Sequence, residues 1–509
     1  MSRRLQLLFA TSEVAPLVKT GGLADVSASL PAALATAGVD VRIVLPAYGS
    51  VLTQLPMLTA IAHVALPAGE ITILATQLPG TDVRVWLVRC DDLFARDGGP
   101  YGQPDGVPWP DNARRFGLFC QAIAWLCRGE VRDEHAANGA ATAPFRPDVL
   151  HLNDWQTGLA AAYINAGWTD DATDRGSRPQ RPGVVFGIHN LAYQGVFDRA
   201  AFNQLSLPER MWQMHGLEFY GQLSFMKSGI AFADALVTVS PTYAKEIQSP
   251  AFGNGLDGLL RERQAILSGV LNGIASDEWN PATDQHLAAT YDATTLERKA
   301  INTRALRNEL GLGLNDQPLI GCISRLAHQK GMDLVLAVLD ALIADGMQLV
   351  VLGGGEQHYV DAFIQAVQRH PGQIAFFARF DERLAHRIEA GADLFLMPSR
   401  YEPCGLNQMF SMHYGTLPIV YRTGGLADTV EHIDVHGANA GLSGTGFIFD
   451  GLTSDALRGA IGDAERLWLM RKRWRAAQQR GMAKDFSWAG SVAEYLHIYG
   501  SVVPQAGAA

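Results

Sequence analysis

Short apolar runs alternate with longer helical stretches, and this alternation restarts in the second half of the chain. In the first half, the predicted strands are residues 5–10, 41–45, 149–152, 184–188 and 235–239. In the second half, they are residues 319–323, 348–352, 374–378, 393–397, 418–421 and 446–449. Strands that alternate with helices at this spacing form parallel sheets, which bind ligands at the carboxyl ends of their strands. The sequence therefore predicts an α/β protein with two parallel sheets.

The chain is long enough for two domains. Its 509 residues exceed what a single hydrophobic core usually holds. Turn residues in Leu271-Asn272-Gly273-Ile274 place the boundary near residue 270, which predicts domains at residues 1–270 and 271–484. The last segment, residues 485–509, contains an aromatic-rich helical run that we expect to cross back and pack on the first domain.

Other segments of the first domain also have predicted structures. Residues 71–78 and 83–90 are expected to pair as strands, and residues 208–232 are predicted to form one long helical region. The polar stretches at residues 132–144 and 170–182 are predicted to be surface insertions.

Composition excludes several classes of function. A net charge of −10 argues against a general nucleic-acid-binding protein. Five sparse cysteines form neither a disulfide framework nor a zinc site, which favours a reducing cytoplasm. His432 and His436 lack a third ligand and no HExxH motif is present, so both are expected to be surface or core histidines. The apolar run that ends at Glu13 is too short for a signal peptide, and no stretch could span a bilayer, so no membrane partner is expected.

Two nearly identical glycine loops lie in the two halves of the chain. The first reads Lys-Thr-Gly-Gly-Leu-Ala-Asp-Val from Lys19, and the second reads Thr-Gly-Gly-Leu-Ala-Asp from Thr423. Adjacent glycines before a helix let the backbone approach a ligand, and the N–H groups of the first helical turn suit an anion. A tight turn is the alternative for either loop alone. Because the loop recurs, we expect the two copies to face each other across a cleft.

Polar residues also follow three of the predicted strands. Asp154 follows one strand, although capping of the next helix explains it equally well. His189 and Asn190 end another strand, and a hydrogen bond to substrate fits His189 better than a triad, because no nucleophile motif is nearby. Arg325 and Lys330 follow a strand of the second domain and can grip a diphosphate, the alternative being a solvated basic loop.

A fourth stretch reads Pro-Ser-Arg-Tyr-Glu-Pro-Cys-Gly-Leu-Asn-Gln from Pro398. Its Glu402 could bind sugar hydroxyls or stabilise an oxocarbenium-like centre, although a carboxylate also suits a helix N-terminus. Cys404 is expected to be a buried packing residue rather than a nucleophile. The Gly353-Gly354-Gly355 run lacks the full G-x-G-x-x-G pattern, and no P-loop is present, so nicotinamide binding is weakly supported and P-loop ATP hydrolysis is unsupported.

Taken together, these stretches resemble one family, the bacterial glycogen synthases and plant starch synthases, which are retaining glycosyltransferases. The shared motifs are residues 19–26, 31–34, 150–155, 188–195, 238–247, 271–274, 324–331, 398–408 and 423–428. The resemblance implies a GT-B fold, in which two Rossmann-like domains face a deep cleft. It implies transfer of glucose from ADP-glucose to the non-reducing 4-hydroxyl of an α-1,4-glucan such as glycogen, with retention and without a metal or pyridoxal phosphate.

The resemblance also implies roles for individual residues. The implied catalytic residues are Asp154, His189, Arg325, Lys330 and Glu402. The implied ADP-glucose-binding residues are Lys19, Gly21, Gly22, Asn190, Asn272, Arg325, Lys330, Gly354, Phe380, Glu402, Cys404, Gly405, Leu406 and Asn407. Phe380 and Asn407 depart from the family, which often has Tyr and Thr at these positions. Both departures leave the preference between ADP-glucose and UDP-glucose open.

Two other functions fit the same architecture. A glucan-binding or regulatory protein could keep the fold without activity, but it would be expected to lose at least one of Lys19, His189, Arg325, Lys330 and Glu402. A phosphorylase-like enzyme would need a lysine for pyridoxal phosphate, and no motif indicates one. Oligomeric state and primer preference are not indicated by the sequence.

Overall fold

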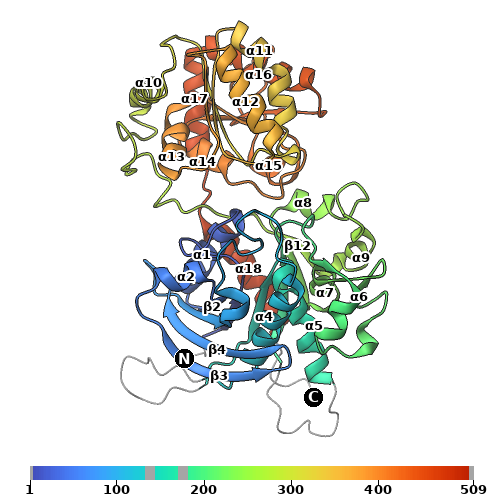
Figure 1. Cartoon of the computed structure of the whole chain (residues 1–509). Helices are drawn as coiled ribbons and strands as arrows, with labels where there is room; N and C mark the ends of the chain where they lie inside the picture. The colour runs from blue at the N-terminus through green and yellow to red at the C-terminus, as the bar shows by residue number, and fades with distance from the viewer. Residues whose placement is uncertain (1–3, 132–143, 170–180, 504–509) are drawn as a thin grey trace. The chain divides into compact units, whose positions relative to one another are not determined.

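The computed structural model describes residues 4–131, 144–169 and 181–503, and the two predicted surface insertions lie almost wholly outside these residues. The chain divides into two compact units (Figure 1). The first unit comprises residues 1–239, 244–273 and 488–509, and the second comprises residues 240–243 and 274–487.

A nine-stranded sheet forms the centre of the first unit. Its spatial order is β12 (Leu267–Gly269), β11 (Ala235–Thr238), β7 (Gly183–Ile188), β6 (Val149–Asn153), β1 (Gln6–Ala10), β2 (Asp40–Pro46), β5 (Arg84–Arg89), β4 (Gly69–Gln77) and β3 (Thr59–Leu66). The pairs from β12 to β5 are parallel, whereas β5–β4 and β4–β3 are antiparallel. Residues 7–10 of β1 are fully buried, as expected for a parallel strand that is covered on both faces.

Along the chain, most helices of this unit connect one strand of the sheet to another. They are α1 (Gly22–Thr36), α2 (Gly49–Gln54), α3 (Asp91–Phe94), α4 (Asn112–Leu126), α5 (Trp155–Thr169), α6 (Arg199–Gln204), α7 (Phe225–Phe232), α9 (Asp257–Glu262) and α18 (Trp488–Val502). Helix α8 (Pro241–Glu246) is divided, because its first three residues belong to the second unit. The last helix, α18, packs against α1 and β7, and the Tyr499 hydroxyl lies 2.9 Å from Nδ1 of His151 on β6. Helix α18 is therefore part of the core of the first unit.

The prediction of one long helical region at residues 208–232 is wrong. This segment contains a single 3-10 turn, Glu209–Met211, and then two short strands, β9 (Glu218–Phe219) and β10 (Gln222–Ser224), which form a small sheet with β8 (Val196–Phe197). The helix α7 begins only at Phe225. Tyr220 and Gly221 both have positive φ angles, which form a turn that a right-handed helix does not tolerate.

The second unit contains a six-stranded, wholly parallel sheet. Its order is β15 (Ile374–Phe377), β14 (Gln348–Leu352), β13 (Leu319–Ile323), β16 (Leu394–Met397), β17 (Leu417–Tyr421) and β18 (Phe447–Phe449). Its helices are α10 (Lys299–Glu309), α11 (Met332–Ala344), α12 (Gln357–Arg369), α13 (Glu382–Gly391), α14 (Asn407–His413), α15 (Gly424–Thr429), α16 (Ser454–Leu469) and α17 (Arg471–Met482). The predicted α/β class with parallel sheets is confirmed.

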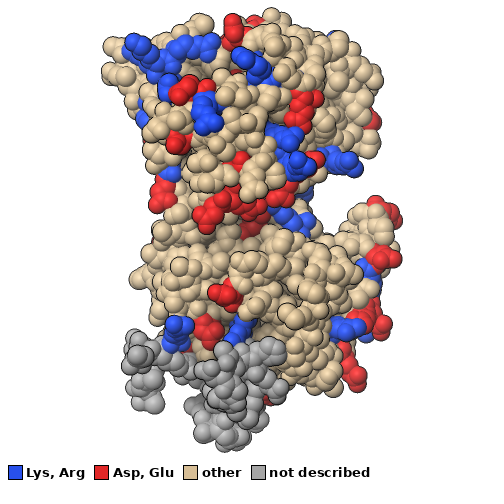
Figure 2. Space-filling view, turned by 90° about the vertical axis from the view of Figure 1, so that its left-hand side faces the viewer, with Lys and Arg blue, Asp and Glu red and all other residues tan. Residues whose placement is uncertain are grey.

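The surface agrees with the acidic composition. On the face drawn in Figure 2, basic and acidic side chains are interspersed and form no continuous basic field. None of the helices in the described part of the chain is both long and apolar enough to cross a bilayer.

Candidate active site

In both units, several of the candidate residues follow strands that flank the point where the strand order reverses. In the first unit the chain proceeds from β1 to β2 and later returns to place β6 on the other side of β1. In the second unit β13 leads to β14 and β15, and the chain then returns to place β16 beside β13. Loops diverge at such a reversal and leave a crevice at the carboxyl ends of the two strands. Lys19 and Asp154 follow one strand pair, and Lys330 and Glu402 follow the other.

The first glycine loop is held by a buried carboxylate. Glu13, which is 3% exposed, accepts hydrogen bonds from the backbone N–H groups of Thr20, at 2.5 Å, and Gly21, at 3.2 Å. It also accepts from the hydroxyls of Thr20 and Tyr101, each at 2.5 Å. Glu13 thus engages the two N–H groups that immediately precede α1. The anion site was predicted at the N–H groups of the first turn of α1, which begins at Gly22, and stays a prediction.

The glycines of this loop nevertheless leave space beside it. Gly21 and Gly22 are exposed, and a Cβ atom on Gly21 would meet nothing within 4 Å. The Lys19 ammonium group lies 2.7 Å from Asp25 in the first turn of α1, and its side chain is 40% exposed. Exposed ion pairs contribute little to stability, so Lys19 can exchange this partner for an anionic ligand at small cost.

Asp154, His189 and Asn190 are brought together as the sequence predicts. Oδ1 of Asp154 accepts from the backbone N–H of His189 at 2.8 Å and from that of Asn190 at 3.3 Å. The carboxylate thus joins the loop after β6 to the loop after β7. Nε2 of His189 donates to Oδ1 of Asn153 at 2.8 Å, and the Asn153 amide is oriented by a bond to the Ala10 carbonyl.

Burial sets the protonation states of this cluster. It raises the pKa of Asp154 to about 7, although the two N–H donors oppose the shift. Burial lowers the pKa of His189 to about 4, so the imidazole is neutral at neutral pH. Because Nε2 carries the proton that Asn153 accepts, Nδ1 of the neutral ring is an acceptor. His189 is therefore suited to receive a hydrogen bond from a sugar hydroxyl.

The raised pKa of Asp154 predicts a pH-dependent stability. Between its unfolded pKa of about 4 and its folded pKa of about 7, the folded state keeps a proton that the unfolded state has lost, so stability falls as pH rises. Asp154→Asn keeps the acceptor oxygen and removes the titration. Denaturant unfolding between about pH 5 and pH 8 should show wild type losing up to about 1.4 kcal/mol per pH unit relative to the variant, mostly below pH 7. Parallel curves would contradict the assignment.

Asn272 is the remaining predicted residue of the first unit. It is 7% exposed, and no hydrogen-bond donor among the described residues reaches its Oδ1. A buried acceptor without a partner is costly, which favours a ligand group at this position.

In the second unit, Lys330 and Glu402 form the closest contact among the predicted residues. Nζ of Lys330 lies 2.5 Å from Oε2 of Glu402, and the side chains are 19% and 9% exposed. Oε2 also accepts from the Ser399 hydroxyl at 2.9 Å. Lys330 follows β13 and Glu402 follows β16, so the pair joins the two strands at the reversal of the sheet.

Three glycines after β14 let this loop lie directly on the loops after β13 and β15. A Cβ on Gly353, Gly354 or Gly355 would come within 1.9, 2.5 or 2.2 Å of the carbonyl oxygen of Ser324, Ala378 or Leu326, respectively. The Leu326 N–H donates to the Gly354 carbonyl at 2.9 Å. Gly354 therefore packs closely against a neighbouring loop. This role is separate from the contact with ADP-glucose that the family resemblance implies.

The second glycine loop differs from the first, despite their similar sequences. Gly425 N–H donates to the carbonyls of Glu402 and Pro403, both at 3.1 Å. A Cβ on Gly424 would lie 2.0 Å from the Glu402 oxygen, and one on Gly425 would lie 2.2 Å from the Cys404 oxygen. The loop is thus packed against the Glu402 segment and buttresses it, rather than presenting the Gly425 N–H to an anion.

The other predicted residues of this unit also lie at the carboxyl edge of its sheet. Arg325 is exposed directly after β13, and the Phe380 ring is 54% exposed after β15. Asn407 donates through Nδ2 to the Ile323 carbonyl at 2.9 Å, which links α14 to β13. Cys404 is buried, as expected for a packing residue. Gly405 has a φ of 72°, and Leu406 is the residue immediately before α14.

Sequence reasoning missed the residues that hold the candidates in place. Glu13, Tyr101 and Ser399 each contact a candidate residue or its loop, yet none is part of a recognised pattern of charges. Glu13 had one available signal, because it is a carboxylate only three residues beyond a buried strand. Ser399 also had a signal, because it lies in the stretch from Pro398, two residues beyond β16, whereas Tyr101 had none.

Comparison with known proteins covers almost the whole chain. The profile of the starch synthase catalytic domain matches residues 6–262, and that of glycosyl transferases group 1 matches residues 307–480. Glycogen synthase 1 of Methylococcus capsulatus is 47% identical over 498 residues, which are 97% of this chain and 96% of that protein. The glycogen synthase of Halorhodospira halophila is 47% identical over 504 residues, 99% of this chain and 100% of the other.

A solved structure is similar over the same extent. The catalytic domain of starch synthase IV from Arabidopsis thaliana, bound to ADP and acarbose, superposes with a TM-score of 0.82 at 29% sequence identity. The match covers 99% of this chain and 100% of that one.

Proposed function

Because the chain belongs to the starch and glycogen synthase family of glycosyltransferases, we propose that it elongates glycogen with glucose from ADP-glucose. The observation that carries the proposal is the Lys330–Glu402 pair, which combines a cation for a phosphate with a carboxylate for a sugar at the sheet reversal. A non-enzymatic relative would have no need to retain this pair together with Lys19, His189 and Arg325.

In the proposed reaction, the bond between the anomeric carbon of glucose and the β-phosphate oxygen of ADP breaks. The 4-hydroxyl oxygen of the glucan bonds to that carbon on the same face, which retains the configuration. The hydroxyl proton passes to the departing phosphate oxygen, and ADP leaves. A covalent glucosyl-enzyme intermediate is the alternative route to retention.

The residues of the second unit would act on the donor. Arg325 and Lys330 stand after β13, where two cations can neutralise the charge that grows on the diphosphate as the sugar departs. The pair with Glu402 fixes the Lys330 ammonium group before substrate arrives, so little reorganisation is needed. Phe380 offers an exposed aromatic face for the nucleotide base.

The residues of the first unit would act on the sugars. Neutral His189 can accept from a glucose hydroxyl, and the buried Oδ1 of Asn272 offers a second acceptor. With fixed cations available, we propose that neither a metal ion nor pyridoxal phosphate takes part. The five cysteines are all free thiols, which supports a location in the reducing cytoplasm.

Turnover assays test this function directly. Purified protein with glycogen and ADP-glucose should release ADP and lengthen glucan chains at a rate that EDTA does not change, and its absorbance spectrum should lack pyridoxal phosphate. The turnover rate with UDP-glucose, measured in parallel, shows which nucleotide the enzyme prefers with Phe380 and Asn407 at these positions. Absence of turnover with both donors would refute the proposal, and glycogen binding without chain growth would favour the regulatory alternative.

A further inference from the structure

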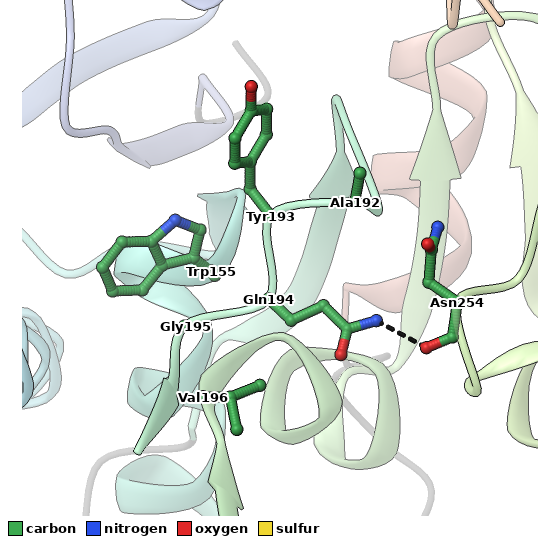
Figure 3. A pocket seen from close by; sticks show the side chains of 7 residues that line it. All are labelled: Trp155, Ala192, Tyr193, Gln194, Gly195, Val196 and Asn254. Atoms are coloured by element: carbon green, nitrogen blue, oxygen red, sulfur yellow. Dashed lines mark hydrogen bonds between the residues drawn. The ribbon is translucent and has the colours of Figure 1, made fainter. Parts of the chain in front are cut away.

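The open cavity drawn in Figure 3 belongs with the candidate active site of the first unit. Its volume is about 500 Å³, and it is lined by Trp155, the loop of residues 192–196 and Asn254. Trp155 directly follows Asp154 in the chain, and the Gln194 amide of the loop donates to the Asn254 carbonyl at 2.9 Å. Every residue that lines this cavity is uncharged. The side chains best suited to a metal ion lie instead in the second unit.

Glu278, Glu382 and His386 form a cluster of metal-ligand side chains in the second unit. Each offers one ligand atom, and these atoms all lie within 4.8 Å of one another, which holds for no other group of three such side chains in the described part of the chain. Glu382 begins α13 and His386 follows four residues later, so both project from one face of the helix. Glu278 comes from a turn much earlier in the chain. The folded unit therefore gathers ligands that no sequence motif joins.

The imidazole of this cluster is held in one orientation. The His386 side chain is 3% exposed, and the Trp279 indole stacks on it with ring centroids 3.8 Å apart and ring planes 10° apart. Trp279 directly follows Glu278, so the same stacking contact keeps the Glu278 backbone beside the histidine. A ligand side chain that is already ordered loses little conformational entropy when an ion binds.

A buried carboxylate determines which nitrogen of His386 faces a metal. Oδ2 of Asp284 accepts hydrogen bonds from Nδ1 of His386 at 2.8 Å and from the Tyr414 hydroxyl at 2.7 Å. With the proton on Nδ1, the neutral ring keeps a lone pair on Nε2, and none of the described residues forms a hydrogen bond with that atom. Histidine ligands usually donate their other N–H to such a carboxylate, which fixes the tautomer and raises the basicity of the metal-binding nitrogen.

The chemistry of these ligands selects a class of ion. An imidazole nitrogen suits Zn²⁺ and neighbouring transition metals, whereas Mg²⁺ and Ca²⁺ prefer ligand sets made of oxygen alone. The two glutamates are exposed, so an ion can reach them from solvent, and their two negative charges equal the charge of a divalent ion. Two carboxylates this close repel each other, and a cation between them relieves the repulsion. Three protein ligands leave a further position for water, as in many zinc sites.

We propose that Glu278, Glu382 and His386 bind a divalent transition-metal ion, for which Zn²⁺ is the best match. The ion ties the turn at Glu278, near the start of the second unit, to α13, and its binding free energy adds to the stability of the folded unit. None of the three residues is assigned to the reaction, so the ion is structural, and the turnover proposed above remains insensitive to EDTA.

A zinc titration of the full, untagged chain tests the site. The protein is stripped of metal with EDTA and freed of the chelator, and calorimetry should then show one equivalent of Zn²⁺ bound to wild type. Glu278→Gln and Glu382→Gln should each weaken this binding about tenfold or more, because an amide oxygen carries no charge. Both glutamates are exposed, so these changes spare the core, which replacement of the buried His386 would not.

The matched control is Glu297→Gln. Glu297 is an exposed glutamate of the same unit that also lies in the first turn of a helix, Leu296–Arg298, but it pairs with Arg475 and is outside the cluster. This variant should bind Zn²⁺ as wild type does. A loss of zinc binding equal to that of Glu382→Gln would show that any exposed carboxylate has this effect, and would overturn the assignment.

Thermal unfolding gives a second readout. Zn²⁺ at about 100 times its dissociation constant should raise the Tm of wild type and of Glu297→Gln by several degrees, and should leave that of the double variant Glu278→Gln with Glu382→Gln unchanged. Equal zinc binding in wild type and the double variant, or no stoichiometric binding to wild type, would overturn the inference. Neither readout uses turnover, so a chain that binds zinc but transfers no glucose would refute the proposed function alone.

Discussion

Lys330→Ala is expected to lower kcat by about 10²- to 10³-fold, with a much smaller change in the KM for ADP-glucose. The reason is that the charge on the departing diphosphate grows mainly in the transition state, where a fixed donor contributes most. The Lys330 ammonium group is held 2.5 Å from Glu402 and is 19% exposed, so water replaces it poorly. Steady-state rates with ADP-glucose and glycogen measure the effect, and a near-normal kcat would refute the role.

The matched control for this prediction is Lys484→Ala. Lys484 also forms an ion pair with a glutamate, Glu431, in the same unit, but this pair is exposed and belongs to no candidate loop. Exposed ion pairs contribute about 0–1 kcal/mol, so this variant should keep the wild-type rate and nearly the wild-type stability. An equal loss of rate in both lysine variants would mean that removal of an ion pair, and not of the Lys330 charge, slows the enzyme.

Glu402→Ala is expected to lower kcat by a similar factor of about 10²–10³. A carboxylate beside the transferred sugar stabilises the positive charge that develops at the anomeric carbon, and this charge is absent from the ground state. The Glu402 side chain is 9% exposed and receives hydrogen bonds from Lys330 and Ser399, which hold it in one orientation. The change should again fall on kcat rather than on the KM for ADP-glucose.

A double variant separates a catalytic role of the pair from a structural one. Removing one partner of a buried pair strands the other charge, and this alone can cost about 3–5 kcal/mol of stability. If the unpaired charge explains the loss of kcat in the single variants, the double variant Lys330→Ala with Glu402→Ala should have a higher kcat than either single variant. We expect no recovery, because both groups act on the transition state and the double variant should be at least as slow as the slower single variant. The thermal midpoint of each variant is the control for folding.

The elements of the second unit were well predicted from the sequence. The predicted bounds of β13, α11 and β14 are those of the structure. Strands of a wholly parallel sheet are buried on both faces, so their sequences are continuous apolar runs, which are easy to recognise. The first unit was harder where strands are short or exposed: β3 is an edge strand with many exposed residues, and β9 and β10 lie within a segment whose composition favours a helix.

The candidate site was predicted to the level of residue type and position after a strand, and its residue roles stay predictions. The alternation of predicted strands and helices placed Asp154, His189, Lys330 and Glu402 at the carboxyl ends of strands, which suffices to propose a ligand site. It did not distinguish between the two glycine loops. One loop is held by Glu13 and leaves Gly21 exposed, whereas the other is packed against the Glu402 segment.

By itself, the sequence determined the α/β class, the mainly parallel sheet of the first unit, the parallel sheet of the second unit and the family. Hydrophobic periodicity and the order of motifs along the chain are written in the sequence directly. Only the tertiary structure decided which partners each polar side chain meets. Glu13 reaches Tyr101 across 88 residues, and Lys330 reaches Glu402 across 72 residues. Burial, which raises the pKa of Asp154 and lowers that of His189, depends on every element that covers the group. Such contacts and desolvation are set by the folded chain as a whole and leave no local pattern in the sequence.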